Sequence, residues 1–529
     1  MNKLAKYLNR HIVGNVFDQP TILASYAADR SILTSTPSLV AVPETVEDVC
    51  RLARFADQLA KRDYRLPITV RGTGLDKTGA AIGDGLVIST EKLSKIEEID
   101  VRGRLVRVQP GVTLGELNAA LGLHGLCLPV EYNPRATLGG LIANCTNDDT
   151  ADRYGSIFHY VERAEVVLAN GDLVQFAPHN LHTISAHKET AAPELALYRK
   201  VETVLDKHAD TVVDRSMRPF DAAGYANVTR VRQGRTLNLL PLLFASQGTL
   251  GIIADIILRV EVLPAERRHM IAVVPDSKVL YRVANYIHEL EPCVLKIYDM
   301  RIVQAAAQYG NRPVLLENSP ESGWLIQASF DYRRSKAGRK VRQSLEILPP
   351  GTFAVESTPE NLAGFLEFNT ALMSYLNDEP DGERLAVLDD IFLPNHRLAE
   401  FLQELPIIES ALGLELALYG SFATSNYHVR PKIDYTDLAG RKLALQFFNQ
   451  YSKLVATMEG SITGGSPEGR VKALATTPAL SDAERVLYTE LKDVFDPHNI
   501  LNPEVKLGAE FRKTLRQLRT SGRYGVITP

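Results

Sequence analysis

The chain has 529 residues and a formal net charge of −4, so it is too long for one hydrophobic core and has no general attraction for nucleic acid or anionic lipid. Its four cysteines lie far apart without a C-x-x-C pair, which argues against a disulfide framework, a zinc ribbon and a cysteine-ligated iron–sulfur cluster. No stretch reaches the roughly 18 apolar residues of a membrane span, and residues 1–17 lack a signal-peptide core, so we expect a cytoplasmic protein without a transmembrane segment.

The first half of the chain alternates predicted strands and helices. Thr45 is expected to cap one helix and Thr113 another, which ends at a glycine. The segments "LPITVRG", "GLVIST" and "RLVRVQPG" have the apolar pattern of strands. Asn170-Gly171 stands between two alternating runs and predicts a β-hairpin. This half therefore indicates an α+β domain.

The second half begins at a predicted domain boundary, Leu263-Pro264. The next two hundred residues alternate longer helices with strands such as "GWLIQASF" and "LELALYGSF". This pattern favours a separate antiparallel sheet with helices on one face.

The stretch "VRGTGLDKTGA", residues 70–80, places three glycines after a predicted strand. Its spacing fits neither G-x-G-x-x-G nor the P-loop, and alone it could be a flexible β-turn. Three more glycine-lined segments, "VQPGVTLGE", "ATLGGLIAN" and "SQGTLGII", occur in the same half. Because glycine lets a ligand approach backbone N–H groups, the four together favour a large polyphosphorylated cofactor held mainly by main chain.

In this order the segments resemble the vanillyl-alcohol-oxidase or p-cresol-methylhydroxylase (PCMH-type) family of FAD enzymes. The resemblance runs from "YAADRS" at Tyr26 through "GTLGII" and resumes at "FDPHNILNP", Phe495 to Pro503. Within this family, the chain most resembles the branch of D-lactate, glycolate and D-2-hydroxyglutarate dehydrogenases. The resemblance implies an α+β fold with a PCMH-type FAD-binding domain (1–265), an α/β substrate cap with an antiparallel sheet (266–475), and a segment returning to the FAD domain (476–529).

The resemblance also assigns cofactor contacts. Residues around the pyrophosphate would be Arg71, Gly72, Thr73, Gly74, Leu75, Asp76 and Gly79. Residues along the flavin would be Pro110, Gly111, Thr137, Gly139, Gly140, Asn144 and Asn502, with Ile252 and Ile253 bonding through backbone atoms. Leu75 stands where members with covalent FAD carry a histidine, so we expect FAD to be bound non-covalently.

On the substrate side the branch pattern is broken. Asn426, His428, Arg430 and Pro431 match, but Ser421 replaces a metal-binding histidine, and Gly465-Ser466 replace the Glu-His pair of a third ligand and the catalytic base. Leu388 falls at or near the position where members of the branch carry a lysine that helps to bind the substrate carboxylate. One imidazole does not hold a divalent ion, so we expect no metal.

Three interpretations remain open for the substrate side. His428 or Glu468 could act as the base for a different alcohol, the site could use residues outside the matched motif, or the protein could bind FAD without turnover. Each candidate also has a structural alternative: a packed histidine for His428 and a loop carboxylate for Glu468. Arg430 and Lys432 could pair with a substrate carboxylate or simply end a solvated strand.

The expected function is oxidation of a small hydroxyl-bearing, 2-hydroxyacid-like substrate by hydride transfer to FAD, with reoxidation by an unknown electron acceptor. The alternatives are a carbohydrate or aldonolactone FAD oxidase, and a flavin-binding protein that has lost hydroxyacid dehydrogenase activity.

Overall fold

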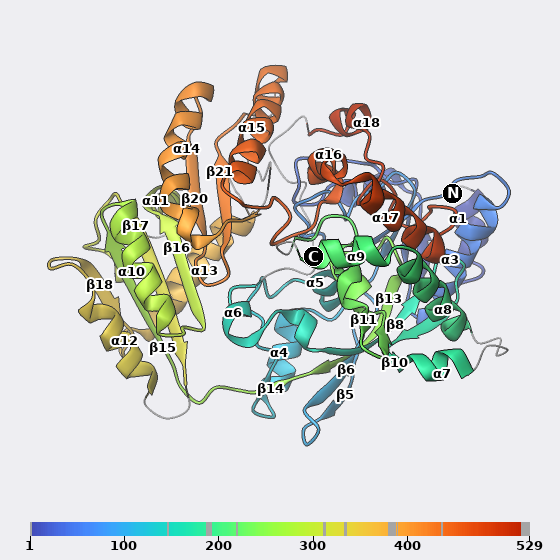
Figure 1. The fold of residues 1–529 in the computed structure, drawn as a ribbon, viewed down its shortest axis with the longest axis horizontal. Coiled ribbons are helices and arrows are strands. Elements are labelled where there is room, and N and C mark those ends of the chain that lie inside the picture. The colour runs from blue at the N-terminus through green and yellow to red at the C-terminus, as the bar shows by residue number, and fades with distance from the viewer. Residues whose placement is uncertain are drawn as a thin grey trace.

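The computed structural model describes residues 3–144, 148–186, 193–217, 221–309, 314–332, 336–378, 388, 390–434 and 437–519. They form two bodies, which lie side by side in Figure 1. The first domain combines the first half of the chain with its C-terminal part, and the cap domain is built on one large sheet. An extended segment after Val262 connects the first domain to the cap.

Two sheets organise the first domain. The smaller sheet has the order β1-β2-β4-β3, with β2, β4 and β3 parallel. Its strands are β1 (Asn15–Phe17), β2 (Leu39–Val42), β3 (Ile68–Arg71) and β4 (Leu86–Ser89). The larger sheet is antiparallel, in the order β5-β6-β13-β8-β9. Its strands are β5 (Ile96–Asp100), β6 (Leu105–Val108), β8 (Val161–Val167), β9 (Leu173–Phe176) and β13 (Ile252–Arg259).

Short strands and helices complete this domain. The short strands are β7 (Leu126–Cys127), β10 (Pro178–Asn180), β11 (Arg232–Gln233), β12 (Thr236–Asn238) and β14 (Glu261–Val262). The helices are α1 (Lys3–Leu8), α2 (Pro20–Ser25), α3 (Val46–Ala60), α4 (Leu114–Gly122), α5 (Leu138–Asn144), α6 (Ala151–Tyr154), α7 (Leu181–Ala186), α8 (Pro193–Lys207), α9 (Ala209–Ser216), α16 (Gly469–Ala479), α17 (Asp482–Phe495) and α18 (Phe511–Arg516).

The local sequence predictions for this domain are confirmed. Thr45 caps α3 and Thr113 caps α4, each in a capping box with the acidic residue three positions later. Gly171 has φ +80° between β8 and β9, which pair as the predicted hairpin.

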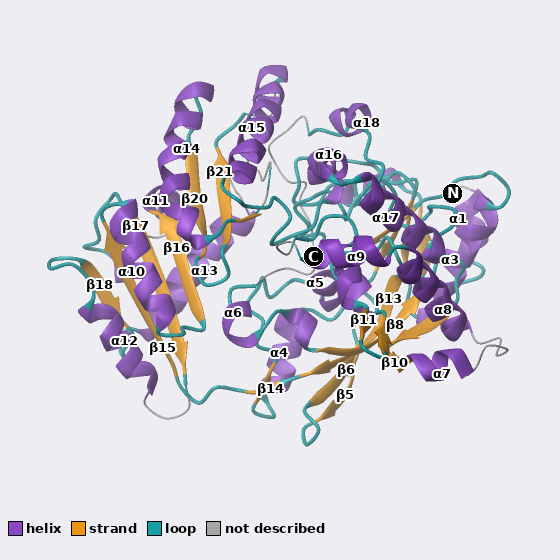
Figure 2. Cartoon of the chain, in the orientation of Figure 1, coloured by secondary structure: helices purple, strands orange, loops and turns teal. Residues whose placement is uncertain are grey.

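The cap sheet has seven strands, all antiparallel, in the order β18-β15-β17-β16-β20-β21-β19 (Figure 2). The strands are β15 (Arg267–Val274), β16 (Val294–Asp299), β17 (Trp324–Asp331), β18 (Phe353–Glu356), β19 (Ile391–Phe392), β20 (Leu416–Ser421) and β21 (Asn426–Pro431). The helices are α10 (Ser277–Glu289), α11 (Met300–Tyr309), α12 (Lys336–Glu346), α13 (Leu362–Asp378), α14 (Leu398–Leu412) and α15 (Leu438–Thr457). The predicted antiparallel sheet is confirmed.

The prediction that helices cover only one face of this sheet is wrong. Helices α10, α12, α14 and α15 share a core with alternate strand residues such as Ile297. Helices α11 and α13 share a second core with the residues that point the other way, such as Tyr298 and Tyr419. Both faces carry apolar side chains because successive strand residues alternate sides and both sets are hydrophobic.

The chain contacts the first domain again from Thr463 onward, where the Thr463 carbonyl accepts from the Ala222 N–H at 2.9 Å. The Val471 N–H donates to the Thr78 carbonyl at 3.1 Å, and Arg470 Nη1 donates to the Gly79 carbonyl at 2.6 Å. Residues 520–529 of the predicted C-terminal segment lie outside the described residues.

No helix within the described ranges is both long and apolar enough to cross a membrane. Cys50, Cys127 and Cys293 are unpaired thiols, and Cys145 lies outside the described residues.

Candidate active site

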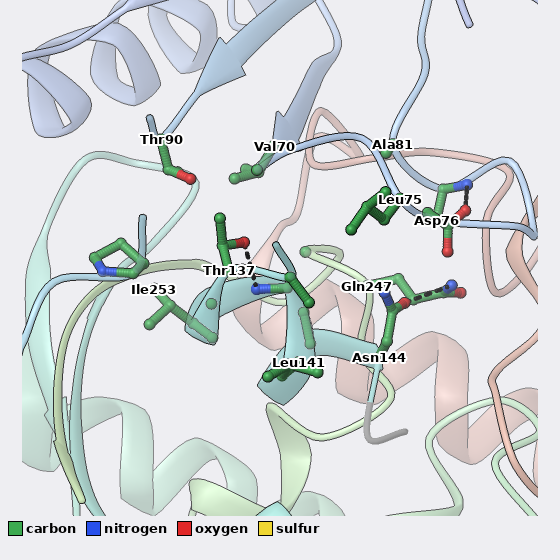
Figure 3. Close-up of a pocket in the computed structure, with 18 of the residues that line it drawn as sticks. Val70, Leu75, Asp76, Ala81, Thr90, Thr137, Leu141, Asn144, Gln247 and Ile253 are labelled. Atoms are coloured by element: carbon green, nitrogen blue, oxygen red, sulfur yellow. Dashed lines mark hydrogen bonds between the residues drawn. The ribbon is translucent and has the colours of Figure 1, made fainter. Parts of the chain in front are cut away.

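A deep cavity of about 1070 Å³, counting the part open to solvent, lies where the glycine-lined segments of the first domain converge (Figure 3). The loop after β3, the turn before α4, the start of α5 and the turn before β13 form its walls. Twelve of the predicted cofactor residues line it: Gly72, Thr73, Gly74, Leu75, Asp76, Pro110, Thr137, Gly139, Gly140, Asn144, Ile252 and Ile253. Segments far apart in the sequence therefore share one cavity.

The loop after β3 is shaped by glycine and by one carboxylate. Gly74 has φ +71°, and a Cβ there would lie 2.2 Å from the Arg71 guanidinium. Asp76 Oδ2 accepts hydrogen bonds from the N–H groups of Thr78 at 2.9 Å and Ala80 at 2.7 Å, which closes the turn. Burial, together with the nearby Asp29, raises the pKa of the Asp76 carboxyl.

Three other predicted cofactor residues support the wall from behind and are not part of its lining. Arg71 is buried and Nη1 donates to the Ala28 carbonyl at 2.8 Å; burial lowers the pKa of its guanidinium. The Gly79 carbonyl accepts from Arg470. The N–H of Gly111 donates to the Leu93 carbonyl at 2.8 Å.

Asn502 also lies behind the wall and fastens two parts of it together. Its Nδ2 donates to the carbonyls of Ala80 and Gln247, both at 2.8 Å. Gln247, which the sequence analysis did not single out, in turn donates from Nε2 to Asn144 Oδ1 at 3.1 Å. A buried amide in a glycine turn was its only signal in the sequence.

The cavity fits an extended cofactor held by main chain. Gly72, Gly74, Gly139, Gly140, Gly248 and Gly251 all belong to its lining, so long stretches of wall carry no side chain. These features match the donor set that an FAD pyrophosphate and isoalloxazine would need.

A second cavity of about 770 Å³, which we call the chamber, lies between the first domain and the cap sheet. Lys77, Tyr132 and Ser466 line both cavities, so the two adjoin there. We call this place the junction. The chamber is otherwise lined by Asn133, Asp148, Asp149, Lys296, Tyr298, Met373, Leu376, Asp390, Tyr419, Gly420, Ser421, Asn426 and His428.

A row of stacked rings forms the sheet wall of the chamber. His428 stacks on Tyr419 with centroids 4.6 Å apart, and Tyr419 stacks on Tyr298 at 6.3 Å. The rings align because these residues are paired neighbours on β16, β20 and β21. His428 thus lies in the chamber lining, and its role toward a substrate stays a prediction.

Arg430 and Lys432, which were predicted to bind a substrate carboxylate, lie outside the lining of the chamber. Arg430 is 2% exposed and donates from Nη2 to the Tyr419 hydroxyl at 2.9 Å, under the ring row. Lys432 follows β21 and is exposed. Neither belongs to the lining of the chamber, which does not support a direct contact with substrate.

Lys296 supplies a cation within the chamber that the sequence analysis missed. Its ammonium forms an ion pair with Asp149. Burial by itself would lower the pKa of Lys296, but the adjoining Asp149 carboxylate outweighs that effect and the pKa is raised. The chamber therefore holds a lysine that stays charged.

A polar cluster at the junction occupies the place where the family motif is broken. The Ser466 hydroxyl donates to Asp390 Oδ1, and Lys472 Nζ donates to the same oxygen at 2.8 Å. A Cβ on Gly465 would lie 1.8 Å from Asp390 Oδ2, so the carboxylate fills the space of any side chain at 465. Asp390 therefore takes up the space that a side chain at position 465 would need.

Glu468 is placed as a structural ion pair. It is fully buried, its carboxylate pairs with Lys506, and it accepts a hydrogen bond from the Gly224 N–H. Burial raises the pKa of the Glu468 carboxyl despite the adjoining ammonium. Since Glu468 lines neither cavity, its position argues against the proposed base role.

Asp148 is a second buried carboxylate of the chamber. Its Oδ1 accepts from the N–H of Thr150 at 2.9 Å, whereas Oδ2 has no hydrogen-bond partner among the described residues. Burial raises the pKa of the Asp148 carboxyl to about 7.

In the described part of the chain, no group of three His, Cys, Asp or Glu side chains is placed to hold a metal ion. His428 and Ser421 both line the chamber, but Gly465 offers no ligand. A metal-free site stays a prediction.

Comparison with known families identifies two domains in the chain. Residues 37–177 match the FAD binding domain, and residues 263–505 match the C-terminal domain of FAD linked oxidases. The matched ranges contain the glycine loop and the cap sheet.

Relatives agree with this assignment. The chain is 24% identical over 505 residues to a D-2-hydroxyglutarate dehydrogenase of Pantoea ananatis, covering 90% of this chain and 49% of that protein. It is also 24% identical over 496 residues to a D-lactate dehydrogenase of Archaeoglobus fulgidus, covering 92% and 94%. The chain thus spans about half the length of the D-2-hydroxyglutarate dehydrogenases it matches.

The fold is shared with solved structures at low sequence identity. The 4-ethylphenol oxidase from Gulosibacter chungangensis superposes with a TM-score of 0.70 at 14% identity, covering 96% of this chain and 97% of that one. The predicted α+β fold with a PCMH-type FAD-binding domain is confirmed.

Proposed function

Because the chain contains an FAD binding domain and a C-terminal domain of FAD linked oxidases, we propose that it oxidises a small hydroxyl-bearing, 2-hydroxyacid-like substrate with non-covalently bound FAD. One observation carries the proposal: the cofactor cavity and the chamber adjoin at Lys77, Tyr132 and Ser466. A substrate in the chamber would meet a flavin in the cavity at that junction. When bound, FAD supplies the acceptor for the hydride of the hydroxyl carbon.

In this proposal the first domain holds the cofactor through main chain. The loop at Gly72–Gly74 would surround the pyrophosphate, and Pro110 with Thr137 would face the ring system. Arg71, Gly79, Gly111 and Asn502 would keep the wall in place through the backbone contacts described above. Leu75 lines the cavity and offers no atom for covalent attachment, which supports non-covalent FAD.

The chamber favours an anionic substrate over a neutral sugar. Lys296 places a positive charge among its lining residues, and Lys77 lies at the junction. A substrate carboxylate would compete with Asp149 for the Lys296 ammonium, as carboxylates compete for any charge-assisted partner. His428, in the ring row, would hydrogen-bond and orient the bound acid.

The test is anaerobic mixing of the purified yellow protein with a panel of D-2-hydroxyacids, their methyl esters, and neutral sugars. We expect loss of flavin absorbance with one or more acids, and weaker responses to the matching esters. Bleaching by sugars alone would favour the carbohydrate oxidase. No bleaching by any compound, with FAD bound, would favour a flavin-binding protein without turnover.

Two further parts of the proposal concern context. The unpaired cysteines fit the cytoplasmic location expected from the sequence. The reduced flavin would pass its electrons to a separate acceptor, which stopped-flow reoxidation with oxygen, quinones and cytochromes would distinguish.

A further inference from the structure

Ser466 occupies the point at which a substrate and a flavin would meet. It is half-buried and belongs to the lining of both cavities. A hydride can move only over a short distance, so the reacting carbon and its oxygen must lie at the junction. A side chain that handles the hydroxyl proton must therefore lie there as well.

The hydrogen bonds of Ser466 leave its oxygen able only to accept from a substrate. Its hydroxyl proton is directed to Asp390 Oδ1, and Oγ accepts from Lys472 Nζ at 3.1 Å. A serine hydroxyl has one proton and two acceptor positions, so one acceptor position remains. A substrate hydroxyl approaching Ser466 must donate its proton to it.

Asp390 is held rigidly behind Ser466. Its Oδ1 also accepts from Lys472, and the Asn426 amide donates to Oδ2 at 3.1 Å in the orientation that satisfies its neighbours. Asp390 and Lys472 are 2% and 1% exposed, so water does not compete for these bonds. The ammonium is fixed further by the carbonyls of Asp390 at 3.2 Å and Ser466 at 3.3 Å.

We propose that Ser466 is a catalytic residue that takes the proton of the substrate hydroxyl while passing its own proton to Asp390, with Lys472 as a positioning residue. This rests on the proposed function. The substrate O–H bond breaks and a new bond forms at Ser466 Oγ, as the former Ser466 proton moves to Asp390 Oδ1. The hydride would leave the hydroxyl-bearing carbon of the substrate for FAD, and the substrate would become a carbonyl compound. Lys472 keeps its three protons throughout.

The relay also explains why the chamber tolerates the broken family motif. Gly465 leaves room for the Asp390 carboxylate, and Ser466 stands between that carboxylate and the junction. The negative charge that receives the proton is thus internal to the chain. His428, in the ring row, is left to bind and orient the rest of the substrate.

The test compares Ser466→Ala, Ser466→Thr and the control Ser461→Ala, a half-buried hydroxyl of the same segment that lines neither cavity. The substrate is the panel acid that bleaches the wild type fastest. We expect Ser466→Ala to slow flavin reduction at saturating acid by about 10²–10⁴-fold, the usual worth of a positioned proton acceptor. Ser461→Ala should stay within about threefold of the wild-type rate, and Ser466→Thr, which keeps the hydroxyl, should recover most of the rate.

Binding readouts separate catalysis from structure. FAD affinity of the apoprotein, from fluorescence quenching, and affinity for oxalate, from the flavin absorbance change, should stay within about threefold of wild type in Ser466→Ala, because binding of either ligand transfers no proton to Ser466. Equal losses of rate and of oxalate or FAD binding would overturn the relay in favour of a packing role, and an unchanged rate would overturn it outright.

A paired variant tests the terminal acceptor. Asp390→Asn with Lys472→Met removes both charges together, so that no buried charge is left alone. Its matched control is Glu468→Gln with Lys506→Met, the other buried acid–lysine pair of this segment, which lies outside both cavities. Only the first pair should slow flavin reduction by the amount seen in Ser466→Ala; equal effects would overturn the relay.

The outcomes also distinguish the relay from the function on which it rests. A wild type that no panel acid reduces would refute the proposed function and the relay together. A wild type that is reduced, with Ser466→Ala reduced equally fast, would refute the relay alone.

Discussion

Replacing Asp148 with asparagine should remove a pH-dependent loss of stability. The folded pKa of this carboxyl is about 7 because burial disfavours its charge, against an ordinary value of 3.8 for an aspartate. The folded protein therefore holds the proton more tightly than the unfolded chain, so the free energy of unfolding falls as the pH rises from about 4 to about 7.

The size of the effect follows from the two pKa values. At about 1.4 kcal/mol per pKa unit, the wild type loses about 3 kcal/mol between pH 5 and pH 8 from this one group. Asparagine keeps an oxygen for the N–H groups of Thr150 and Glu131 and has no charge to bury. Its unfolding free energy should lack this part of the pH dependence.

Urea unfolding at pH 5 and pH 8 measures the difference, with the exposed Asp210→Asn as control. We expect Asp148→Asn to gain stability relative to wild type as the pH rises, by about 3 kcal/mol over this interval. A variant and a wild type that change in parallel would refute the reasoning, because the carboxyl would then have an ordinary pKa in the folded protein.

Three other changes have definite outcomes. Gly74→Glu should prevent FAD binding, because its side chain would meet Arg71 and place a carboxylate in the cofactor cavity. The control Gly125→Glu, at a similarly positive φ but in open space, should bind FAD normally. Bound FAD in both variants would show that the loop is only a turn. Lys296→Met should weaken binding of the acid substrate by about tenfold or more and Asp149→Asn should strengthen it, both read from the concentration dependence of flavin bleaching; unchanged affinities would place the carboxylate elsewhere. EDTA should leave flavin reduction unchanged, whereas one zinc or manganese ion per chain, lost together with activity, would show that ligands outside the family motif hold a metal.

Much of the first domain could be predicted from the sequence because its signals are local. Thr45 and Thr113 cap their helices, and Asn170-Gly171 closes its hairpin, through contacts within a few residues. The glycine segments were informative together, since each bares backbone to the same cavity. Which glycines line it and which only support it, such as Gly79 and Gly111, depends on packing between segments.

The chamber could not be predicted in the same way. Lys296, Asp390 and Lys472 come from β16, the residue before β19, and α16, so their places in the chamber and at the junction depend on packing between distant segments. Sequence matching recorded a missing Glu at Gly465, but only the structure shows Asp390 in its space. Glu468 illustrates the opposite error: it lies close in sequence to the expected base, yet the first turn of α16 directs it to Lys506.

Single-turnover flavin reduction by the fastest panel acid, deuterated at the hydroxyl carbon, is the most direct test of hydride transfer at the junction. Under anaerobic conditions the bound FAD should be bleached more slowly by the deuterated acid than by the protiated one. Denaturing the protein afterwards should release the FAD. The slower bleaching is predicted because the hydride leaves this carbon at the junction of the two cavities. Two results would contradict hydride transfer from the substrate to FAD at the junction. In the first, no hydroxyl substrate reduces the flavin; in the second, both isotopic forms reduce it at the same rate in a single chemical step.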